Sequence, residues 1–306
     1  AASAHAQDTK PQSDKPENKK KAPIYDEQAD ARIQIAEALA HAEKENRRVL
    51  IQWGANWCIW CYRLHDHFKE DRDVAKKLMY EYDVVLVDLG NDGKKNRDLA
   101  AKYDAELAGL PYLTVLDANG EVIANQETGS LELQGEGKKG HDGEKVLAFL
   151  TKHQASYLEA DEVLLAGINQ ASADDKRVFV HFGAPWCGWC KRLEAWMAQE
   201  DVAMVLGKYF VDVKIDVDRT IDGQGLYKKL SQDKGGGIPW SAVLDEKGDV
   251  IAGSFMKGNQ NIGYPVSEEE IEAFLAMLAK GQDRLSDEDR TFLAESLRLA
   301  RPNRNH

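Results

Sequence analysis

Short apolar runs alternate along the chain with longer segments in which apolar residues recur every three or four positions. Runs of about four to eight apolar residues bounded by turn residues predict buried strands, and the longer periodic segments predict amphipathic helices. The strands are expected at 49–53, 84–89, 112–116, 121–124, 178–182, 210–217, 240–244 and 250–254. Helices are expected at 25–48, 74–82, 96–105, 144–153, 267–280 and 285–299, with another that starts near Tyr157.

Two of these helices carry a further signal. Ser267 followed by Glu270 is a capping box, which predicts the start of the helix at 267–280. In the helix at 25–48, one apolar stripe is expected to face the core. That stripe consists of Ile33, Ala36, Leu39 and Ala40.

The order of elements is written twice, around two similar motifs. These are Trp57-Cys58-Ile59-Trp60-Cys61 and Trp186-Cys187-Gly188-Trp189-Cys190, and each follows an apolar run and a short turn. Cys187 lies 129 positions after Cys58, and the register persists further on, where Pro111 and Pro239 lie 128 positions apart. A repeat that keeps step over this length indicates a duplicated domain.

Each motif should place its two cysteines in the first turn of a helix fed by a buried strand. Cysteines three positions apart on a helix face the same way, within the distances that a disulfide needs. Backbone N–H groups and the dipole at a helix start favour an anion, which makes the first thiol the better nucleophile. We therefore expect Cys58 and Cys187 to attack, Cys61 and Cys190 to resolve, and each motif to close its own disulfide.

Composition and charge narrow the classes of partner. The chain has 306 residues, which suggests about two domains. Its formal net charge is −12, so it lacks the basic balance that binding to nucleic acid requires. No apolar run approaches the ~18 residues of a membrane-spanning helix, so no membrane span is expected.

All four cysteines belong to the two pairs, which leaves none for a separate structural bridge. In an exported protein such pairs can exchange disulfides, and in a cytosolic one they indicate a redox or metal site. Ala4-His5-Ala6 fits the small-x-small site that ends a signal peptide. We expect a periplasmic or otherwise exported protein, with a cytoplasmic location as the alternative. The polar residues 7–23 are expected to form a disordered tether.

The order strand, W-C-x-x-C helix, strand, helix and then a proline at the mouth of a hairpin resembles the thioredoxin fold, twice over. Residues 57–64 and 186–193 are similar to bacterial thioredoxin-like proteins of the thioredoxin-7 and disulfide-reductase C-terminal-domain kind. The resemblance covers ~25–280 and implies an α/β protein of two tandem thioredoxin folds, each a central mixed sheet flanked by helices. The expected boundaries are 1–24 for the tether, 25–153 and 154–282 for the domains, and 283–306 for a C-terminal helical extension.

The resemblance also implies a substrate-binding surface beside each disulfide. In the family, a cis-proline pair faces the disulfide and offers its backbone to an incoming chain, a role that falls here on Leu110-Pro111 and Ile238-Pro239. Tryptophans next to the cysteines would add an apolar rim suited to an unfolded chain, with core packing as the alternative. They are Trp57, Trp60, Trp186 and Trp189.

The chain departs from thioredoxin at two places. Thioredoxin has Gly-Pro between its cysteines, whereas this chain has Ile59-Trp60 and Gly188-Trp189, which leaves the redox poise open. Thioredoxin also keeps a buried Asp six residues before its first cysteine. The corresponding positions here hold Gln52 and His181.

His181 is predicted to take the proton of Cys190 when a mixed disulfide is resolved, because a buried second thiol reacts faster beside an acceptor. Lys214 occupies the neighbouring strand, where thioredoxin also keeps a lysine. Gln52 and Leu86 stand at the matching places of the first domain, and neither can accept a proton. This pattern predicts two unequal sites, of which the second is the more active. A core histidine satisfied by the backbone is the alternative for His181.

The cysteine pairs also fit other kinds of site. Two pairs can form a four-thiolate centre, and Cys58, Cys61 and His65 have the helical spacing of a partial metal site. The separation of the pairs places them on different domains, and His65 is expected at a helix surface, so no metal is expected. Haem attachment is disfavoured because Tyr62 and Lys191 stand where that motif needs His. No cofactor is expected beyond the redox-active disulfides.

Together these features predict a thiol–disulfide oxidoreductase that acts on protein disulfides, as a reductase or isomerase more readily than as a strong oxidase. Its partners would be protein thiols and disulfides and an electron donor or acceptor protein. The alternative is a chaperone or adaptor that binds chains through its hydrophobic face and whose disulfides are structural or redox-silent. Reduction potentials separate the two, because structural disulfides resist reduction.

Overall fold

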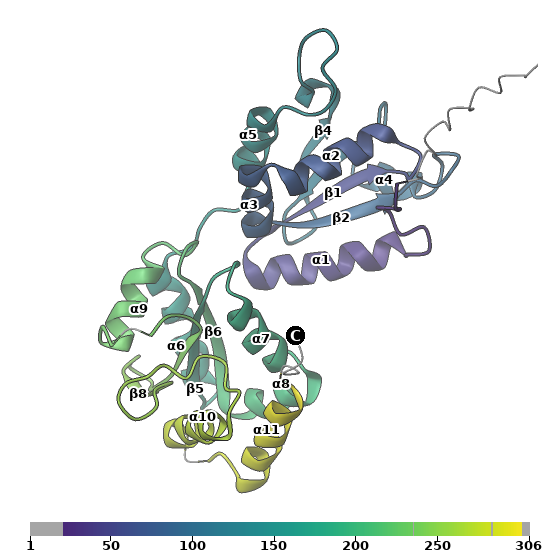
Figure 1. Cartoon of the computed structure of the whole chain (residues 1–306). Coiled ribbons are helices and arrows are strands. Elements are labelled where there is room, and N and C mark those ends of the chain that lie inside the picture. Colours follow the sequence, from purple (N-terminus) through teal and green to yellow (C-terminus); the bar gives the residue numbers. More distant parts are fainter. Residues whose placement is uncertain (1–20, 235, 283, 302–306) are drawn as a thin grey trace, which may run out of the picture.

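The computed structural model describes residues 21–234, 236–282 and 284–301, which form two units, one in each half of the chain (Figure 1). Most of the predicted tether, including Ala4-His5-Ala6, falls on residues 1–20 and lies outside the described residues. Of the remainder, Lys21 already contacts the first unit, because its Nζ lies 2.8 Å from Oδ2 of Asp66. Among the helices of these described ranges, none combines the length and the apolarity that crossing a membrane requires.

The first unit is a four-stranded mixed sheet with helices on both faces. Its strands are β1 (Arg48–Gly54), β2 (Tyr82–Asp88), β3 (Tyr112–Leu116) and β4 (Val122–Glu127). Its helices are α1 (Ala31–Glu45), α2 (Ile59–Glu70), α3 (Arg72–Glu81), α4 (Arg97–Lys102) and α5 (Gly143–His153), with the short 3-10 turn η1 (Gly129–Leu131). The strand order is β2-β1-β3-β4, with β1 parallel to β2 and antiparallel to β3.

The second unit repeats this arrangement. Its strands are β5 (Arg177–Gly183), β6 (Phe210–Asp216), β7 (Trp240–Leu244) and β8 (Val250–Gly253), in the order β6-β5-β7-β8. Its helices are α6 (Ala160–Ala173), α7 (Gly188–Met197), α8 (Glu200–Tyr209), α9 (Gly223–Ser231), α10 (Glu268–Gly281) and α11 (Asp287–Leu299). Two such sheets, each flanked by helices, confirm the predicted pair of thioredoxin folds.

The central strand of each unit is buried on both faces, which explains its continuous apolar run. In β1, Ile51 and Trp53 pack on the side of α1 and α4, whereas Leu50 packs on the side of α2, α3 and α5. The strand is therefore enclosed by helices on both sides. The turn after it places the cysteine motif at the carboxyl end of the strand.

The stripe predicted for the first helix was wrong except at Leu39, which packs against the core. Ile33 is 58% exposed, and Ala36 and Ala40 are exposed as well. The inner face is formed instead by the buried residues Ala31, Ile35 and Ala42. The predicted helix also began too early, because Asp30 caps the helix and accepts from the N–H of Arg32.

The C-terminal helix α11 is part of the second unit's core. Leu293 and Leu297 are fully buried in the same cluster as Trp196 of α7, and Trp196 Nε1 donates to Ser296 Oγ at 2.9 Å. The segment predicted as an extension at 283–306 thus contains a helix that packs in the core of the second unit. No counterpart of this helix appears among the described residues of the first unit.

The two units meet where the end of α1 and the end of α3 approach β6, the edge strand of the second sheet (Figure 1). Lys214 of β6 pairs with Glu45 at the last residue of α1, at 2.5 Å. Arg219, in the turn after β6, pairs with Glu81 at 3.2 Å. The predicted boundary at 153/154 falls between α5 and α6, in the short connection that leads to this junction.

Candidate active site

Each cysteine motif forms the start of a helix, as predicted. Cys58 is the N-cap of α2 and Cys187 is the N-cap of α7, and the sulfur of each accepts from the backbone N–H of the second cysteine at 3.1 Å. The first cysteine therefore occupies the position where side-chain acceptors normally satisfy free N–H groups. A thiolate formed there would face the positive end of the helix dipole.

Each motif closes its own disulfide, which confirms the predicted pairing. Cys58 is bonded to Cys61 and Cys187 to Cys190, with Cα–Cα distances of 5.3 and 5.2 Å. This pairing uses all four cysteines and excludes both a bridge between the units and a four-thiolate centre in this state. Within the described part of the chain, no group of three or more metal-ligating side chains is present.

Each disulfide faces a cis-proline loop. The Leu110–Pro111 and Ile238–Pro239 peptide bonds are both cis. In the second unit the Cys187 sulfur lies 3.7 Å from the carbonyl oxygen of Ile238. Asn261 holds this loop, because its side-chain amide donates to the carbonyls of Gly237 and Pro239 at 3.0 and 2.9 Å.

The tryptophans form a partly exposed rim around the cysteines. Trp57 and Trp186 are 55% and 57% exposed, and their ring N–H groups are held by Gly90 O and Asp218 Oδ2. The tryptophans between the cysteines lean on a neighbouring ring. Trp60 meets His141 edge-on at 5.8 Å, and Trp189 stacks on Tyr264 at 6.1 Å.

Beneath Cys61, the structure places two neutral polar groups, the Tyr25 phenol and the Gln52 amide. A β-carbon on Gly54 would collide with the Tyr25 hydroxyl and would lie 2.6 Å from the Cys61 sulfur, so the phenol and the disulfide are neighbours. Gln52, fully buried, donates to the Tyr25 hydroxyl at 2.6 Å. Burial raises the pKa of Tyr25 above its usual value, which keeps the phenol protonated.

Beneath Cys190, the structure places the side chain of Glu194. Its Oε1 and the Cys190 sulfur each lie 3.5 Å from the position of a β-carbon on Gly183, so they are separated by no more than twice that distance. Glu194 is one helical turn after Cys190 on α7. Its Oε1 accepts from Lys214 Nζ at 2.9 Å.

His181 of β5 lies on the side of the sheet that α7 covers, but its ring pairs with a residue other than Glu194. Its ring is 3% exposed and stacks on Phe179, and its Nε2 lies 3.0 Å from Oδ1 of Asp212. The alternative was that the backbone satisfies the hydrogen-bonding capacity of His181. In the structure, its Nε2 pairs with the Asp212 carboxylate instead. Whether His181 takes the proton of Cys190 stays a prediction.

Sequence reasoning missed Tyr25 and Glu194. Glu194 could have been found, because residues four apart on a helix share a face and Cys190 is four positions before it. Tyr25 lies more than thirty positions before Cys61 and carries no local signal. The metal-site alternative also named His65, which corresponds by position to Glu194 and lies half-buried on α2.

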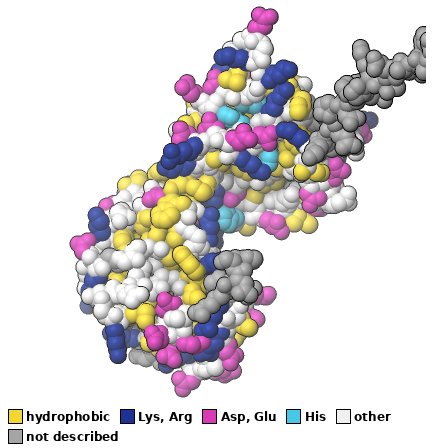
Figure 2. Space-filling view, viewed as in Figure 1, with side chains coloured by type: hydrophobic (Ala, Val, Ile, Leu, Met, Phe, Trp, Pro, Cys, Tyr) yellow, Lys and Arg dark blue, Asp and Glu magenta, His cyan; other side chains and the backbone are white. Residues whose placement is uncertain are grey.

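The two sites occupy different places relative to the junction of the units. The start of α2 lies at the end of the first unit that is remote from the second, whereas the start of α7 points toward the first unit (Figure 1). Pro185 and Lys191 of the second motif line a cavity of about 440 Å³ together with Met79 and Tyr80 of α3. Figure 2 shows Lys, Arg and His side chains in the notch between the units.

Comparisons with known proteins match both halves of the chain to thioredoxin-like families. Residues 35–134 match the family described as "Thioredoxin-like domain". Residues 144–297, just over half of the chain, match the Thioredox_DsbH family, described as "Protein of unknown function, DUF255".

Several curated and solved proteins are similar to parts of the chain. It is 27% identical over 97 residues to the disulfide bond reductase DsbH of Chlamydia pneumoniae, and 28% identical over 184 residues to the protein disulfide-isomerase tigA of Aspergillus niger. These matches cover 29% and 57% of this chain and 57% and 46% of the relatives, so the chain spans about half the length of the curated relatives it matches. A disulphide isomerase structure from Xylella fastidiosa Temecula1 is 29% identical, with a TM-score of 0.36, over 42% of this chain and 95% of that one.

Proposed function

The chain belongs to the DsbH family of thioredoxin-like proteins, and from that premise we propose that it is a thiol–disulfide oxidoreductase that acts on protein disulfides through two C-x-x-C sites. The observation that carries the proposal is the repeated geometry of a disulfide at a helix start, opposite a cis-proline. The activities for which the relatives are named, disulfide reduction and isomerisation, belong to the same class of reaction.

The reaction needs only the two thiols of one site. In the reduced protein, the thiolate of Cys187 attacks one sulfur of a substrate disulfide, and the other substrate sulfur leaves as a thiolate that takes up a proton. Cys190 then loses its proton and attacks the Cys187 sulfur, which releases the second substrate thiol and leaves the Cys187–Cys190 disulfide. Two electrons pass to the substrate. Cys58 and Cys61 play the same parts at the first site.

Substrate binding falls on the residues around each disulfide. An extended chain can pair with the backbone beside the cis-proline and rest its apolar side chains on the tryptophan rim. At the first site these residues are Trp57, Trp60, Leu110 and Pro111. At the second site they are Trp186, Trp189, Ile238 and Pro239.

Two side chains are candidates for the proton of Cys190. His181 is the one predicted from the sequence, and Glu194 is the one whose carboxylate lies near the sulfur. His181 lies on β5 and Glu194 on α7, which packs over that strand. One of the two is enough to accept the proton. Substituting each separately distinguishes them.

We propose that the donor or acceptor of the two electrons is another protein with reactive thiols, and that the protein works outside the cytoplasm. Cysteine usage supports this location, because all four cysteines fall in two pairs that can exchange disulfides in an exported protein. Because the reaction runs in either direction, the choice between reductase, isomerase and oxidase rests with the reduction potentials of the two sites and of that partner.

Reduction of insulin disulfides by dithiothreitol tests the activity. Changing all four cysteines to Ser should abolish the catalysed rate. Cys58→Ser with Cys61→Ser should leave most of it, whereas Cys187→Ser with Cys190→Ser should remove most of it, because the structure places a carboxylate near the buried thiol of the second site and a protonated phenol near that of the first. Equal rates for the two double variants would contradict the inequality, and a normal rate for the fourfold variant would contradict the function.

The alternative function, a chaperone or adaptor, is favoured by one observation. Trp57 and Trp186 of the rim are 55% and 57% exposed, while Cys58 and Cys187 are only 5% and 3% exposed. If the disulfides are structural, the fourfold Ser variant should lose stability but still suppress aggregation of an unfolded substrate such as reduced insulin chains. If the protein is an oxidoreductase, the fourfold Ser variant should instead lose its catalytic activity before it loses stability.

A further inference from the structure

A carboxylate from the first unit belongs to the charge cluster beneath the second disulfide. The ammonium of Lys214 on β6 lies 2.5 Å from Oε2 of Glu45 and 2.9 Å from Oε1 of Glu194. Glu45 is the last residue of α1 in the first unit, and Glu194 is one turn past Cys190 on α7. The three side chains are largely buried, with exposed fractions of 14%, 20% and 20% for Glu45, Lys214 and Glu194.

The surroundings favour the charged forms of Lys214 and Glu45. Burial opposes the charged form of Lys214, but the carboxylates of Glu45 and Glu194 outweigh it and raise its pKa above the usual value. Burial likewise opposes ionisation of Glu45, and the neighbouring ammonium outweighs it and lowers its pKa. Counted as formal charges, two carboxylates and one ammonium leave the cluster with one net negative charge. Without Glu45 it would be neutral.

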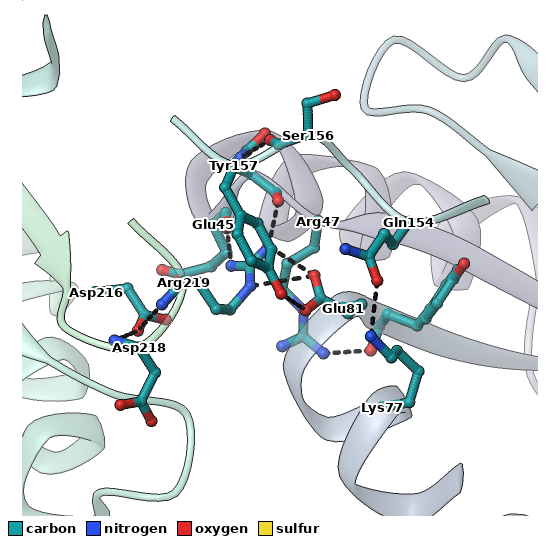
Figure 3. Close-up of polar contacts among 12 residues, drawn as sticks. Glu45, Arg47, Lys77, Glu81, Gln154, Ser156, Tyr157, Asp216, Asp218 and Arg219 are labelled. Carbon is teal, nitrogen blue, oxygen red and sulfur yellow. Dashed lines mark hydrogen bonds and ion pairs between the residues drawn. The ribbon is translucent and has the colours of Figure 1, made fainter. Parts of the chain in front are cut away.

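The junction holds Glu45 in this position. Arg219 donates to the backbone carbonyls of Glu45 and Asn46 at 2.9 and 2.7 Å and pairs with the fully buried Glu81. Tyr157 donates to the other oxygen of Glu81 at 2.7 Å (Figure 3). The end of α1 is thus fixed to the second unit by bonds that do not involve the Glu45 carboxylate.

Among the described residues, the first site has no cluster that joins the two units. Leu86 stands at the position of Lys214 in the parallel register, opposite Gln52 as Lys214 is opposite His181. The structure places the Tyr25 phenol and Gln52 near Cys61, and the buried Asp88 that acts on this phenol belongs to the same unit. In the described part of the chain, the contribution of one unit to the other's redox site therefore runs from the first unit to the second.

From this geometry we propose that the first unit sets the redox equilibrium of the second site: Glu45 offsets the charge of Lys214, which makes the field at the Cys187–Cys190 pair less positive and disfavours its thiolate form. The inference rests on the proposed function only for its biological role, since the equilibrium between the Cys187–Cys190 disulfide and its dithiol can be measured whether or not the site is catalytic. Glu45 acts through Lys214 and is a positioning residue. The field of one charge at this range, screened by protein, amounts to a few-fold in an equilibrium constant.

The experiment measures this equilibrium in the full chain that carries Cys58→Ser and Cys61→Ser. The protein disulfide and two thiols of glutathione exchange with the protein dithiol and oxidised glutathione, and dithiothreitol replaces glutathione if the disulfide is harder to reduce. Glu45→Gln should shift the constant roughly three- to tenfold toward the dithiol, which is about 15 to 30 mV for a two-electron couple. It should also lower the pH at which Cys187 forms its thiolate.

Three variants test the cause. Lys214→Met should shift the constant in the opposite direction, because it leaves both carboxylates uncompensated. Glu45→Asp keeps the charge and should stay near the parent. Tyr157→Phe weakens the junction without changing a charge near the cysteines, and should leave the constant unchanged. The other charged groups of the cavity, His41, Lys44, Arg47, Lys191, Asp216 and Arg219, are the same in every variant.

The results separate an electrostatic role from a structural one. A shift of the same sign in Glu45→Gln and Lys214→Met, no shift in Glu45→Gln, or an equal shift in Tyr157→Phe would overturn the inference. A parent whose disulfide yields only to strong dithiothreitol buffers would count against the proposed function. It would leave the comparison among variants intact.

Discussion

The side chains near the two buried cysteines differ in charge. Tyr25 and Gln52 present neutral groups to Cys61, whereas Glu194 presents a carboxylate near Cys190. A carboxylate can take the proton that Cys190 must lose before it attacks, and a phenol whose pKa burial has raised cannot do so at neutral pH. The chemistry of the second step is therefore expected to differ between the sites.

Glu194→Gln should slow the resolution of a mixed disulfide at Cys187 by about 10²-fold, the low end of general acid–base effects. Single-turnover release of a fluorescent peptide thiol from the mixed disulfide measures this step. His181→Gln is the matched variant, since it removes the acceptor predicted from the sequence. We expect the smaller loss there because the ring is paired with Asp212. A full rate in Glu194→Gln with a slow His181→Gln would return the role to His181.

The stability of the fold around the first site is expected to depend on pH through His141. His141 is 4% exposed, its two ring nitrogens lack hydrogen-bond partners among the described residues, and it lies edge-on to Trp60. Burial, with nearby His67 and Arg63, lowers the pKa of His141 to about 4. Because the folded pKa lies below the unfolded value of about 6.5, the neutral ring costs stability as pH falls from about 6.5 toward 4.

Replacing His141 with Phe should remove this dependence. Between pH 7 and pH 5 the free energy of unfolding of the parent should fall by about 1 to 2 kcal/mol more than that of the variant. Urea denaturation at the two pH values measures the difference. Parallel losses in the two proteins would show that His141 is not the titrating group.

At the scale of elements, periodicity predicted the strands closely, since β3 and β7 match the expected ranges and the others differ only at their ends. It failed for the stripe of α1, because an apolar Ile33 on an exposed face is indistinguishable in sequence from one that faces the core. It gave no ranges for α8 and α9, which only the repeat implied, and it treated α11 as an extension. Packing of α11 depends on contacts with Trp196 about a hundred positions earlier, which no local pattern records.

Leu297→Ala should destabilise the second unit by about 2 to 5 kcal/mol, since this side chain is fully buried between α11 and the rest of the core. Leu299→Ala, two positions later and 88% exposed, is the control and should cost less than about 0.5 kcal/mol. Chemical denaturation followed by tryptophan fluorescence measures both. Similar small effects would mean that α11 is not needed by the core.

At the scale of the molecule, the duplication is visible in the sequence but its consequence is not. The motifs, their spacing and the proline register predicted both disulfides and the residues around them. Glu45 could not be predicted as part of the second site, because it lies 169 positions before Lys214 and reaches it only through the way the two units pack. The sequence already predicted unequal sites from Gln52 and His181, and the proposed role of Glu45 adds a difference that arises only at the junction.

The central claim is that both disulfides are redox-active, and their reduction potentials test it most directly. The whole oxidised protein is equilibrated in graded glutathione buffers and then in dithiothreitol buffers, quenched with acid, and its thiols at each pair are counted by mass mapping after alkylation. The account predicts two separate transitions, one for Cys58–Cys61 and one for Cys187–Cys190, both above about −300 mV. Disulfides that remain closed throughout the glutathione range and open only near or below that potential would contradict it.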